Sequence, residues 1–167
     1  SPGTGKTTLG IQFLLAGRDV GEKGIYVTLS ETKEELAAIA RSHGWSLEGI
    51  EIHELVDPES EIGKVQYTMF EPAEIELSST ISSVQEQIEA IQPNRIVFDS
   101  LSEMRLLSQS PLRYRRQILA LKQFLAGRNC TTLLLDDKAT GEDQQLQSLA
   151  HGVIRLEQQL TDYGNER

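Results

Sequence analysis

The chain opens with a run of residues suited to holding phosphate groups, SPGTGKTT over residues 1–8. This is most of the pattern G-x-x-x-x-G-K-[S/T], whose first glycine would stand just before residue 1. Gly3 and Gly5 allow backbone conformations in which successive N–H groups face phosphate oxygens. Lys6 would bring a positive charge to the β- and γ-phosphates, and the Thr7 hydroxyl could bind Mg²⁺ at the start of the helix that follows. The residues predicted to contact a nucleoside triphosphate are Gly3, Thr4, Gly5, Lys6, Thr7 and Thr8.

A Mg²⁺ ion beside phosphates also needs a carboxylate, and two aspartates are placed to supply one. Asp99 follows the apolar run 95–98, and Asp136 follows the apolar run 131–135. Both would lie at the carboxyl edge of a parallel sheet, where ligands bind in such folds. The residue pattern does not separate the two, and either aspartate could instead cap a turn.

Hydrolysis of a phosphate needs a group that activates water, and Glu31 is the candidate. Glu31 comes at the end of the predicted strand 25–29, the first strand after the phosphate-loop helix, which would bring it near the γ-phosphate. The alternative is that Glu31 only precedes Thr32, the cap of the next helix, and favours the dipole of that helix. The predicted catalytic residues are Glu31 and Lys6, and the predicted metal ligands are Thr7 and one of the two aspartates.

Helical and strand patterns alternate along most of the chain. The predicted helices cover residues 7–16, 32–41, 78–91 and 110–126, and the predicted strands cover residues 25–29, 50–55, 95–98, 131–135 and 153–156. Thr32-x-x-Glu35 is a capping box that would start the second helix. Residues 57–76 are less regular and predict a loop-rich insertion. Strands separated by helices imply right-handed crossovers, so we expect an α/β fold with a mainly parallel sheet flanked by helices.

The composition fits one globular domain of 167 residues and argues against several classes of protein. The 25 acidic residues outnumber the 16 basic ones, and the formal charge of −9 disfavours a general nucleic-acid binder. A local basic cluster, Arg113, Arg115 and Arg116, fits a solvated helix face better than a nucleic-acid contact. No signal peptide or membrane-spanning pattern is visible. The single cysteine, Cys130, suits the reducing cytoplasm and a buried structural role.

Short motifs along the chain resemble those of a known family. They read SPGTGKTTL, YVTLSET followed by RSHGW, YTMFEPAEIEL, RIVFDSLSEMR, TTLLLDD and HGVIRLE. In this order they resemble the KaiC-like branch of the RecA-type P-loop ATPases, over nearly the whole chain. The resemblance implies a RecA-like P-loop NTPase fold, ATP and Mg²⁺ as cofactors, and hydrolysis of ATP.

The resemblance also assigns roles to individual residues. It makes Asp99, in RIVFDS, the Walker B aspartate that holds Mg²⁺, and it places Asp136 on the neighbouring strand. In the relatives, the segment that matches RSHGW lies near the nucleotide, so Ser42 is expected to approach the base. Trp45, in the same segment, is expected to contribute to packing.

The chain departs from the family pattern at functional positions. Relatives carry two acidic residues where this chain has Ser30 and Glu31, and the first of the two is generally taken as the base. Glu31 would then take over that role, or hydrolysis would be slow. Clock-protein relatives phosphorylate a Ser/Thr pair upstream of the strand that matches GVIRLE, where this chain offers only Ser148. Autophosphorylation at Ser148 stands against the plainer interpretation of a solvated turn residue.

The family assembles as a ring, and the resemblance implies a hexamer in which basic residues of a neighbouring subunit complete each site. We expect residues 1–167 to form a single domain that lacks the strand before the P-loop and the C-terminal basic segment, and so is truncated at both ends. Signalling proteins would be suitable partners. Membrane and nucleic-acid partners are not expected.

The sequence thus predicts an ATP-binding, Mg²⁺-dependent ATPase domain that hydrolyses the γ-phosphate slowly within an oligomer. The alternative is a nucleotide-dependent switch or scaffold with negligible turnover, and Ser30 keeps this alternative open. A third hypothesis, a recombinase-like DNA-binding protein, is disfavoured by the net charge of −9.

Overall fold

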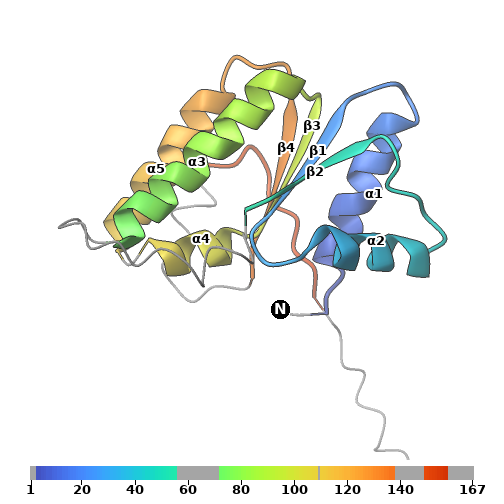
Figure 1. The fold of residues 1–167 in the computed structure, drawn as a ribbon, viewed down its shortest axis with the longest axis horizontal. Coiled ribbons are helices and arrows are strands. Elements are labelled where there is room, and N and C mark those ends of the chain that lie inside the picture. The colour runs from blue at the N-terminus through green and yellow to red at the C-terminus, as the bar shows by residue number, and fades with distance from the viewer. Residues whose placement is uncertain (1–2, 56–71, 109, 138–148, 158–167) are drawn as a thin grey trace, which may run out of the picture.

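A parallel sheet of four strands forms the centre of the molecule in the computed structural model, which describes residues 3–55, 72–108, 110–137 and 149–157 (Figure 1). The strands lie in the order β2-β1-β3-β4, and each neighbouring pair is parallel. Their bounds are β1 (Gly24–Thr28), β2 (Ile50–Glu54), β3 (Arg95–Asp99) and β4 (Thr131–Leu135). The predicted α/β fold with a mainly parallel sheet is confirmed.

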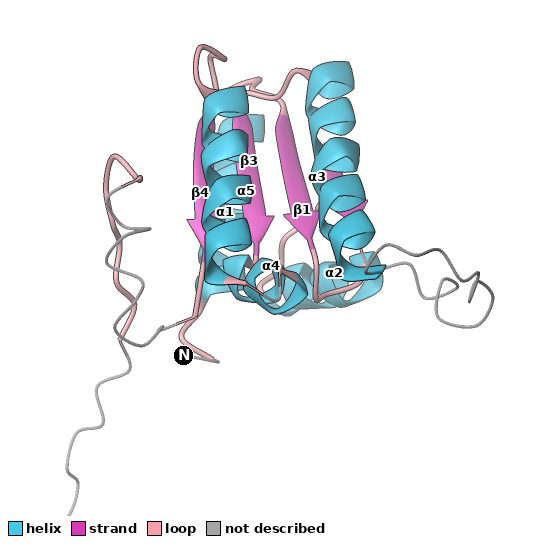
Figure 2. Cartoon of the chain, turned by 90° about the vertical axis from the view of Figure 1, so that its left-hand side faces the viewer, coloured by secondary structure: helices cyan, strands magenta, loops and turns pink. Residues whose placement is uncertain are grey.

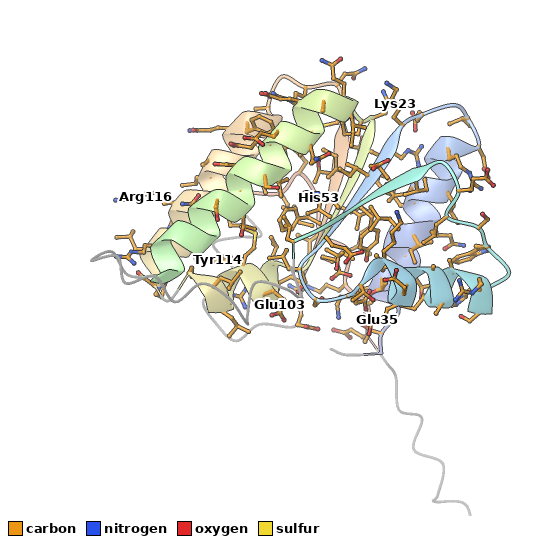
Figure 3. All side chains as sticks on the ribbon, in the orientation of Figure 1. Lys23, Glu35, His53, Glu103, Tyr114 and Arg116 are labelled. Carbon is orange, nitrogen blue, oxygen red and sulfur yellow. The ribbon has the colours of Figure 1, made fainter. Side chains whose placement is uncertain are left out.

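Helices cover both faces of this sheet (Figure 1). The helices on one face are α1 (Lys6–Arg18) and α2 (Lys33–Ser42), and those on the other face are α3 (Pro72–Ile91), α4 (Leu101–Leu107) and α5 (Pro111–Leu125). All strands point toward one edge of the sheet, and α1 begins at this edge (Figure 2). Lys23 marks the opposite edge, where the strands begin (Figure 3). The predicted phosphate-binding loop therefore lies at the carboxyl edge of the sheet, together with Asp99 and Asp136.

The two central strands send alternate side chains into two separate apolar cores. On β1, Ile25 and Val27 face the core formed with α3, α4 and α5, whereas Tyr26 faces the core formed with α1 and α2. On β3, Phe98 faces the core formed with α3, α4 and α5, and Val97 faces the core formed with α1 and α2. Burial on both faces explains why these strands are almost continuously apolar in sequence. It also fixes which polar residues of β1 and β3 face α1.

Helix α1 lies very close to the sheet because Gly10 has no side chain. A Cβ atom on Gly10 would stand 3.0 Å from Cγ1 of Val97 and 3.5 Å from Cε2 of Tyr26. The distance to Tyr26 is an ordinary contact, but the distance to Val97 is tighter than usual packing, so a larger residue would push α1 away from β3 unless Val97 shifts.

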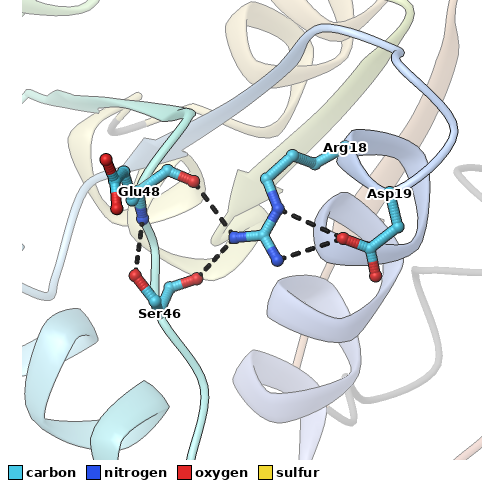
Figure 4. Close-up of polar contacts among 4 residues, drawn as sticks. All are labelled: Arg18, Asp19, Ser46 and Glu48. Carbon is cyan, nitrogen blue, oxygen red and sulfur yellow. Dashed lines mark hydrogen bonds and ion pairs between the residues drawn. The ribbon is translucent and has the colours of Figure 1, made fainter.

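The far end of α1 holds the connection between α2 and β2 (Figure 4). The Arg18 guanidinium donates to the carbonyl oxygens of Ser46 at 2.7 Å and Glu48 at 3.0 Å, and it pairs with Asp19 at 3.1 Å. Arg18 also lies in the last turn of α1, where a positive charge favours the helix dipole. One half-buried side chain thereby ties the end of α1 to the connection between α2 and β2.

The sequence located most helices and strands but placed some boundaries wrongly. The capping box of α2 is confirmed, since the Thr32 hydroxyl accepts from the Glu35 N–H and the Glu35 carboxylate accepts from the Thr32 N–H. Helix α3 begins at Pro72, so residues 72–76 are helical rather than part of a loop. Proline fits the first turn of a helix, and the Ala, Glu and Leu residues that follow favour helical structure. Helix α4 was not predicted; the Ser100-x-x-Glu103 pattern before it could have indicated it.

The predicted strand at residues 153–156 is wrong. These residues form no strand in the structure, and the side chains of Val153 and Ile154 are 51% and 71% exposed. A strand needs a neighbour that completes its ladder of hydrogen bonds, and none of the four described strands pairs with this segment.

No helix in the described part of the chain has the length and apolar character needed to cross a membrane.

Candidate functional site

The loop before α1 has the backbone geometry of an anion-binding turn. Gly3 and Gly5 adopt φ angles of 77° and 86°, in the left-handed region that glycine tolerates best. Gly5 is the N-cap of α1, no side-chain cap is found on this helix, and its first turn contains no acidic residue. Within the described residues no side chain caps the start of α1, and the positive end of the helix dipole points toward the loop. This geometry suits phosphate oxygens.

Lys6, the first residue of α1, is held by an aspartate that the sequence analysis did not single out. The Lys6 ammonium donates to Oδ1 of Asp137 at 2.7 Å, and the Lys6 side chain is 19% exposed. The hydrogen bond from Lys6 holds the pKa of the Asp137 carboxyl below its usual range. The phosphates of a nucleotide would therefore compete with Asp137 for the charge of Lys6.

Asp99, at the end of β3, meets the P-loop directly. The Thr7 hydroxyl donates to Oδ2 of Asp99 at 3.2 Å, and Asp99 is only 5% exposed. Tyr26, on β1, donates its hydroxyl to the same oxygen at 2.6 Å. The peptide bond between Asp99 and Ser100 is cis. The structure therefore brings together Thr7 and Asp99, the two residues predicted to hold Mg²⁺.

Asp136 follows β4, the neighbour of β3, and is engaged elsewhere. It accepts hydrogen bonds from the Ser102 hydroxyl at 2.7 Å and from the Arg105 guanidinium at 3.0 Å, both on α4. The sequence pattern left Asp99 and Asp136 as equal candidates for the metal ligand. Among the described residues, only Asp99 of this pair is hydrogen-bonded to the P-loop threonine.

Glu31 lies in the turn between β1 and α2, and its backbone is fixed by Thr28. The Glu31 N–H donates to the Thr28 hydroxyl at 2.9 Å, and this hydroxyl donates to the Glu31 carbonyl at 2.8 Å. Oε2 of Glu31 is buried and has no hydrogen-bond partner among the described residues. Burial, followed by the negative charges of Asp99 and Glu35, raises the pKa of the Glu31 carboxyl above its usual range, while Thr7 and Lys6 lower it. A carboxylate that is short of donors and has a raised pKa is well suited to accept a proton.

The oxygen atoms at this edge of the sheet fit a hard cation such as Mg²⁺. The Thr7 hydroxyl, the Asp99 carboxylate and the unpartnered Glu31 oxygen are the types of ligand that Mg²⁺ prefers. Within the described residues, no group of three or more His, Cys, Asp or Glu side chains is arranged to hold a metal by itself. This agrees with a Mg²⁺ ion that the protein would hold through few groups and the nucleotide phosphates would hold through the rest.

The sequence model of the ATPase family KaiC matches residues 1–167. The chain belongs to the KaiC family of ATPases. It is accordingly an ATP-binding P-loop ATPase domain with a RecA-type fold, and the family predicted from the sequence motifs is confirmed.

Individual relatives agree with membership of the KaiC family. A UPF0273 protein of Methanopyrus kandleri is 29% identical and one of Pyrococcus horikoshii is 31% identical, each over 93% of this chain. The chain spans 65% and 66% of the length of these two relatives. The crystal structure of a KaiC-like protein from the hyperthermophilic archaeon Pyrococcus horikoshii is 28% identical, with a TM-score of 0.61, over 80% of this chain and 58% of that chain.

Ser42, which the KaiC resemblance placed near the base, is exposed at the C-terminal end of α2. Its hydroxyl donates to the Ile39 carbonyl at 2.7 Å. No hydrogen bond or ion pair found within the described residues links Ser42 to the P-loop, so its role stays a prediction. Trp45 is half-buried against the core beside α1 and stacks on His43 with a centroid distance of 4.8 Å, as a packing residue would.

Other predicted residues of the KaiC-family site are placed as follows. Thr4 and Thr8 of the P-loop are half-buried, and Gly3 and Gly5 are exposed, which leaves room for a ligand above the loop. Ser30, which aligns with the base of the relatives, is exposed, whereas its neighbour Glu31 lies among the charges of the site. Ser148 lies outside the described residues.

The sequence analysis missed two residues of the site, Asp137 and Tyr26. Asp137 follows Asp136 directly, and the acidic pair at the end of an apolar strand was the available signal. Tyr26 lies on the predicted strand 25–29, and no role was assigned to its hydroxyl. Its two-residue spacing from Thr28 could have placed its hydroxyl on the same face as the site.

The two strand-end aspartates should respond differently to substitution. Asp99→Asn removes the charge beside Thr7, so Mg²⁺-stimulated ATP hydrolysis should fall roughly 10- to 100-fold, as expected for the loss of one charge-assisted interaction. Asp136→Asn, whose partners are on α4, should keep most of the stimulation. The measurement is the hydrolysis rate over a range of Mg²⁺ concentrations. The reverse pattern would exchange the roles of the two residues.

Proposed function

We propose that this KaiC-family domain binds ATP together with Mg²⁺ and slowly hydrolyses the γ-phosphate as part of an oligomer. The observation that carries the proposal is the 3.2 Å hydrogen bond from the Thr7 hydroxyl to Asp99 Oδ2, together with the buried oxygen of Glu31 that has no hydrogen-bond partner among the described residues. Phosphate binding, metal binding and water activation need these groups at one place. They come from α1, from β3 and from the turn after β1.

Each residue has a defined role in the proposed reaction, an in-line attack of water on the γ-phosphate. The N–H groups around Gly3 and Gly5 bind phosphate oxygens, and Lys6 stabilises the charge that develops on them. Thr7 and Asp99 would hold Mg²⁺, and the ion when bound would neutralise part of the phosphate charge. Glu31 orients the attacking water and accepts its proton.

Two features support slow rather than rapid turnover. Ser30 stands where relatives carry the acidic residue generally taken as the base, so Glu31 has to act alone. Asp137 holds Lys6 at 2.7 Å, and phosphates have to displace it before Lys6 can act on them.

A single-turnover experiment tests the proposal. ATP labelled at the γ-phosphate is mixed with excess protein, with and without Mg²⁺, and free phosphate is followed over time. We expect complete but slow release of phosphate that requires Mg²⁺. Tight binding of ATP with no release of phosphate would instead support the second candidate function, a nucleotide-dependent switch or scaffold, which the serine at position 30 favours.

Replacement of Asp137 should tighten nucleotide binding. Asp137→Asn removes the charge that pairs with Lys6 and that would repel phosphates, so the affinity for ATP without Mg²⁺ should rise roughly 3- to 10-fold. The measurement is equilibrium binding of a fluorescent ATP analogue. Asp19→Asn removes an equal charge at the opposite end of α1 and serves as the matched control. Unchanged or weaker binding by Asp137→Asn would contradict the competition between Asp137 and phosphates.

The oligomer is proposed to be a ring in which a neighbouring subunit supplies basic residues to each site. The resemblance of the chain to the KaiC family, which implies a ring, supports this idea. Light scattering with and without ATP and Mg²⁺ tests it. A protein that stays monomeric at all concentrations while hydrolysing ATP at full rate would overturn it.

A further inference from the structure

A phenol group lies inside the core and is bonded to the Walker B carboxylate. Tyr26 is 1% exposed and packs among apolar side chains of α1 and α2. Its hydroxyl donates to Oδ2 of Asp99 at 2.6 Å. The packing alone would be served by phenylalanine, because the ring fills the space and a buried hydroxyl adds a desolvation cost unless it is bonded. The Tyr26 hydroxyl therefore contributes through its hydrogen bond to Asp99 and not through packing.

The sheet register explains how the two side chains meet. Tyr26 lies opposite Val97, and Thr28 lies opposite Asp99, in the parallel pairing of β1 with β3. Tyr26 and Asp99 are thus diagonal neighbours on the face that α1 covers, a separation that an aromatic side chain can span. Gly10 brings α1 against this same face, and its Cβ position is 3.5 Å from the Tyr26 ring. The ring is confined between helix and sheet, so its hydroxyl is held in a fixed place.

The Tyr26 hydroxyl is a permanent donor. A phenol is protonated near neutral pH, so the Tyr26 hydroxyl has a proton to donate in its 2.6 Å hydrogen bond to Asp99. Oδ2 of Asp99 thereby receives two hydrogen bonds, one from Tyr26 and one from Thr7. The Thr7 hydroxyl donates to Asp99 and keeps its lone pairs for a cation. Of the two donors, only Tyr26 lies outside the P-loop, so its hydrogen bond to Asp99 does not depend on the P-loop.

We propose that Tyr26 is a positioning residue for Asp99, and that its hydroxyl fixes the carboxylate so that Asp99 and Thr7 can hold Mg²⁺ together. This role rests on the proposed ATP- and Mg²⁺-binding function. Tyr26 touches neither the nucleotide nor the metal in this scheme, and it acts only through Asp99. Removing its hydroxyl should weaken the contribution of Mg²⁺ to nucleotide binding and leave the Mg²⁺-independent part intact.

The experiment measures binding of a fluorescent ADP analogue as Mg²⁺ is added, so that no turnover is needed. In Tyr26→Phe, the affinity without Mg²⁺ should stay within about twofold of the wild type, and the Mg²⁺ concentration for half-maximal enhancement should rise about tenfold, the effect of one charge-assisted hydrogen bond. Tyr114→Phe is the matched control. Tyr114 is also buried, at 5% exposure, but it lies on the opposite face of the sheet (Figure 3).

A double-mutant cycle separates a positioning role from a structural one. If Tyr26 acts through Asp99, Tyr26→Phe should change the Mg²⁺ response about tenfold in the wild type and by less than about twofold in the Asp99→Asn background. Thermal unfolding of each variant without ligand checks that the fold is kept. A normal Mg²⁺ response of Tyr26→Phe, or equal effects in both backgrounds, would overturn the role of Tyr26 alone. If Mg²⁺ does not change the nucleotide affinity of the wild-type protein, both the proposed function and the positioning role of Tyr26 are overturned.

Discussion

Replacing Lys6 with alanine should abolish most of the nucleotide affinity. Lys6 is the first residue of α1 and supplies the positive charge at a loop in which Gly3 and Gly5 adopt left-handed backbone angles. Its ammonium would make charge-assisted hydrogen bonds to the β- and γ-phosphates, so we expect affinity for ATP to fall roughly 100-fold and hydrolysis to fall further. Equilibrium binding of a fluorescent ATP analogue measures the first effect and phosphate release the second.

The control for this variant is Lys23→Ala. Lys23 is exposed and lies at the opposite edge of the sheet (Figure 3). Its replacement therefore removes the same charge from the protein without changing the P-loop. Circular dichroism checks that both variants fold. Wild-type affinity for ATP in a folded Lys6→Ala protein would refute the P-loop assignment.

Replacing Glu31 with glutamine should separate binding from hydrolysis. The substitution keeps the size of the side chain but removes its ability to accept a proton, so hydrolysis in a single turnover should slow by about 10²- to 10⁴-fold. Binding of ATP should stay close to that of the wild type or become tighter, because a negative charge near the phosphates is lost. Glu34→Gln, three residues further along and exposed on α2, is the matched control. Undiminished hydrolysis by Glu31→Gln would remove Glu31 from the reaction.

Without ligand, Glu31→Gln should have a higher free energy of unfolding than the wild type, and this difference should grow as the pH rises. The pKa of Glu31 is raised in the folded protein, so the folded state binds its proton more tightly than the unfolded chain does. The contribution of Glu31 to stability is therefore complete below the ordinary carboxyl pKa and is lost as the pH rises through the raised one. Glutamine does not titrate and suffers no such loss. Thermal unfolding without nucleotide or Mg²⁺ between about pH 4 and pH 8 measures the difference.

Sequence reasoning located the parts of the fold that depend on local chemistry. The capping box at Thr32 and Glu35, the apolar strands β1 and β3, and the glycines of the P-loop each carry their signal within a few residues. Helix α4 has only seven residues, too few for a periodic pattern to stand out. Residues 153–156 have the composition of a strand, but a strand also needs a neighbour, and composition does not report one.

The residues of the candidate site also fall into two groups, those with a local signal in the sequence and those without one. Lys6, Thr7, Glu31 and Asp99 could be proposed from the sequence because their types and positions match a local motif or the end of a strand, although only the family resemblance favoured Asp99 over Asp136. Asp137 and Tyr26 join the site only through contacts over 131 and 73 residues of sequence, which depend on the order of the strands and on their register. Such long-range contacts are set by the packing of the whole domain, and a single sequence gives no direct measure of them.

The outer edge of β4 bears on how any assembly of this protein should be interpreted. Within the described residues, β4 pairs only with β3, and Leu134 on this strand is 38% exposed. An open strand edge with unpaired N–H and C=O groups and an apolar side chain invites pairing with another chain. Such self-association would increase with protein concentration whether or not nucleotide is present. Association can therefore be attributed to a nucleotide-dependent ring only if it appears on addition of ATP and is lost in Lys6→Ala.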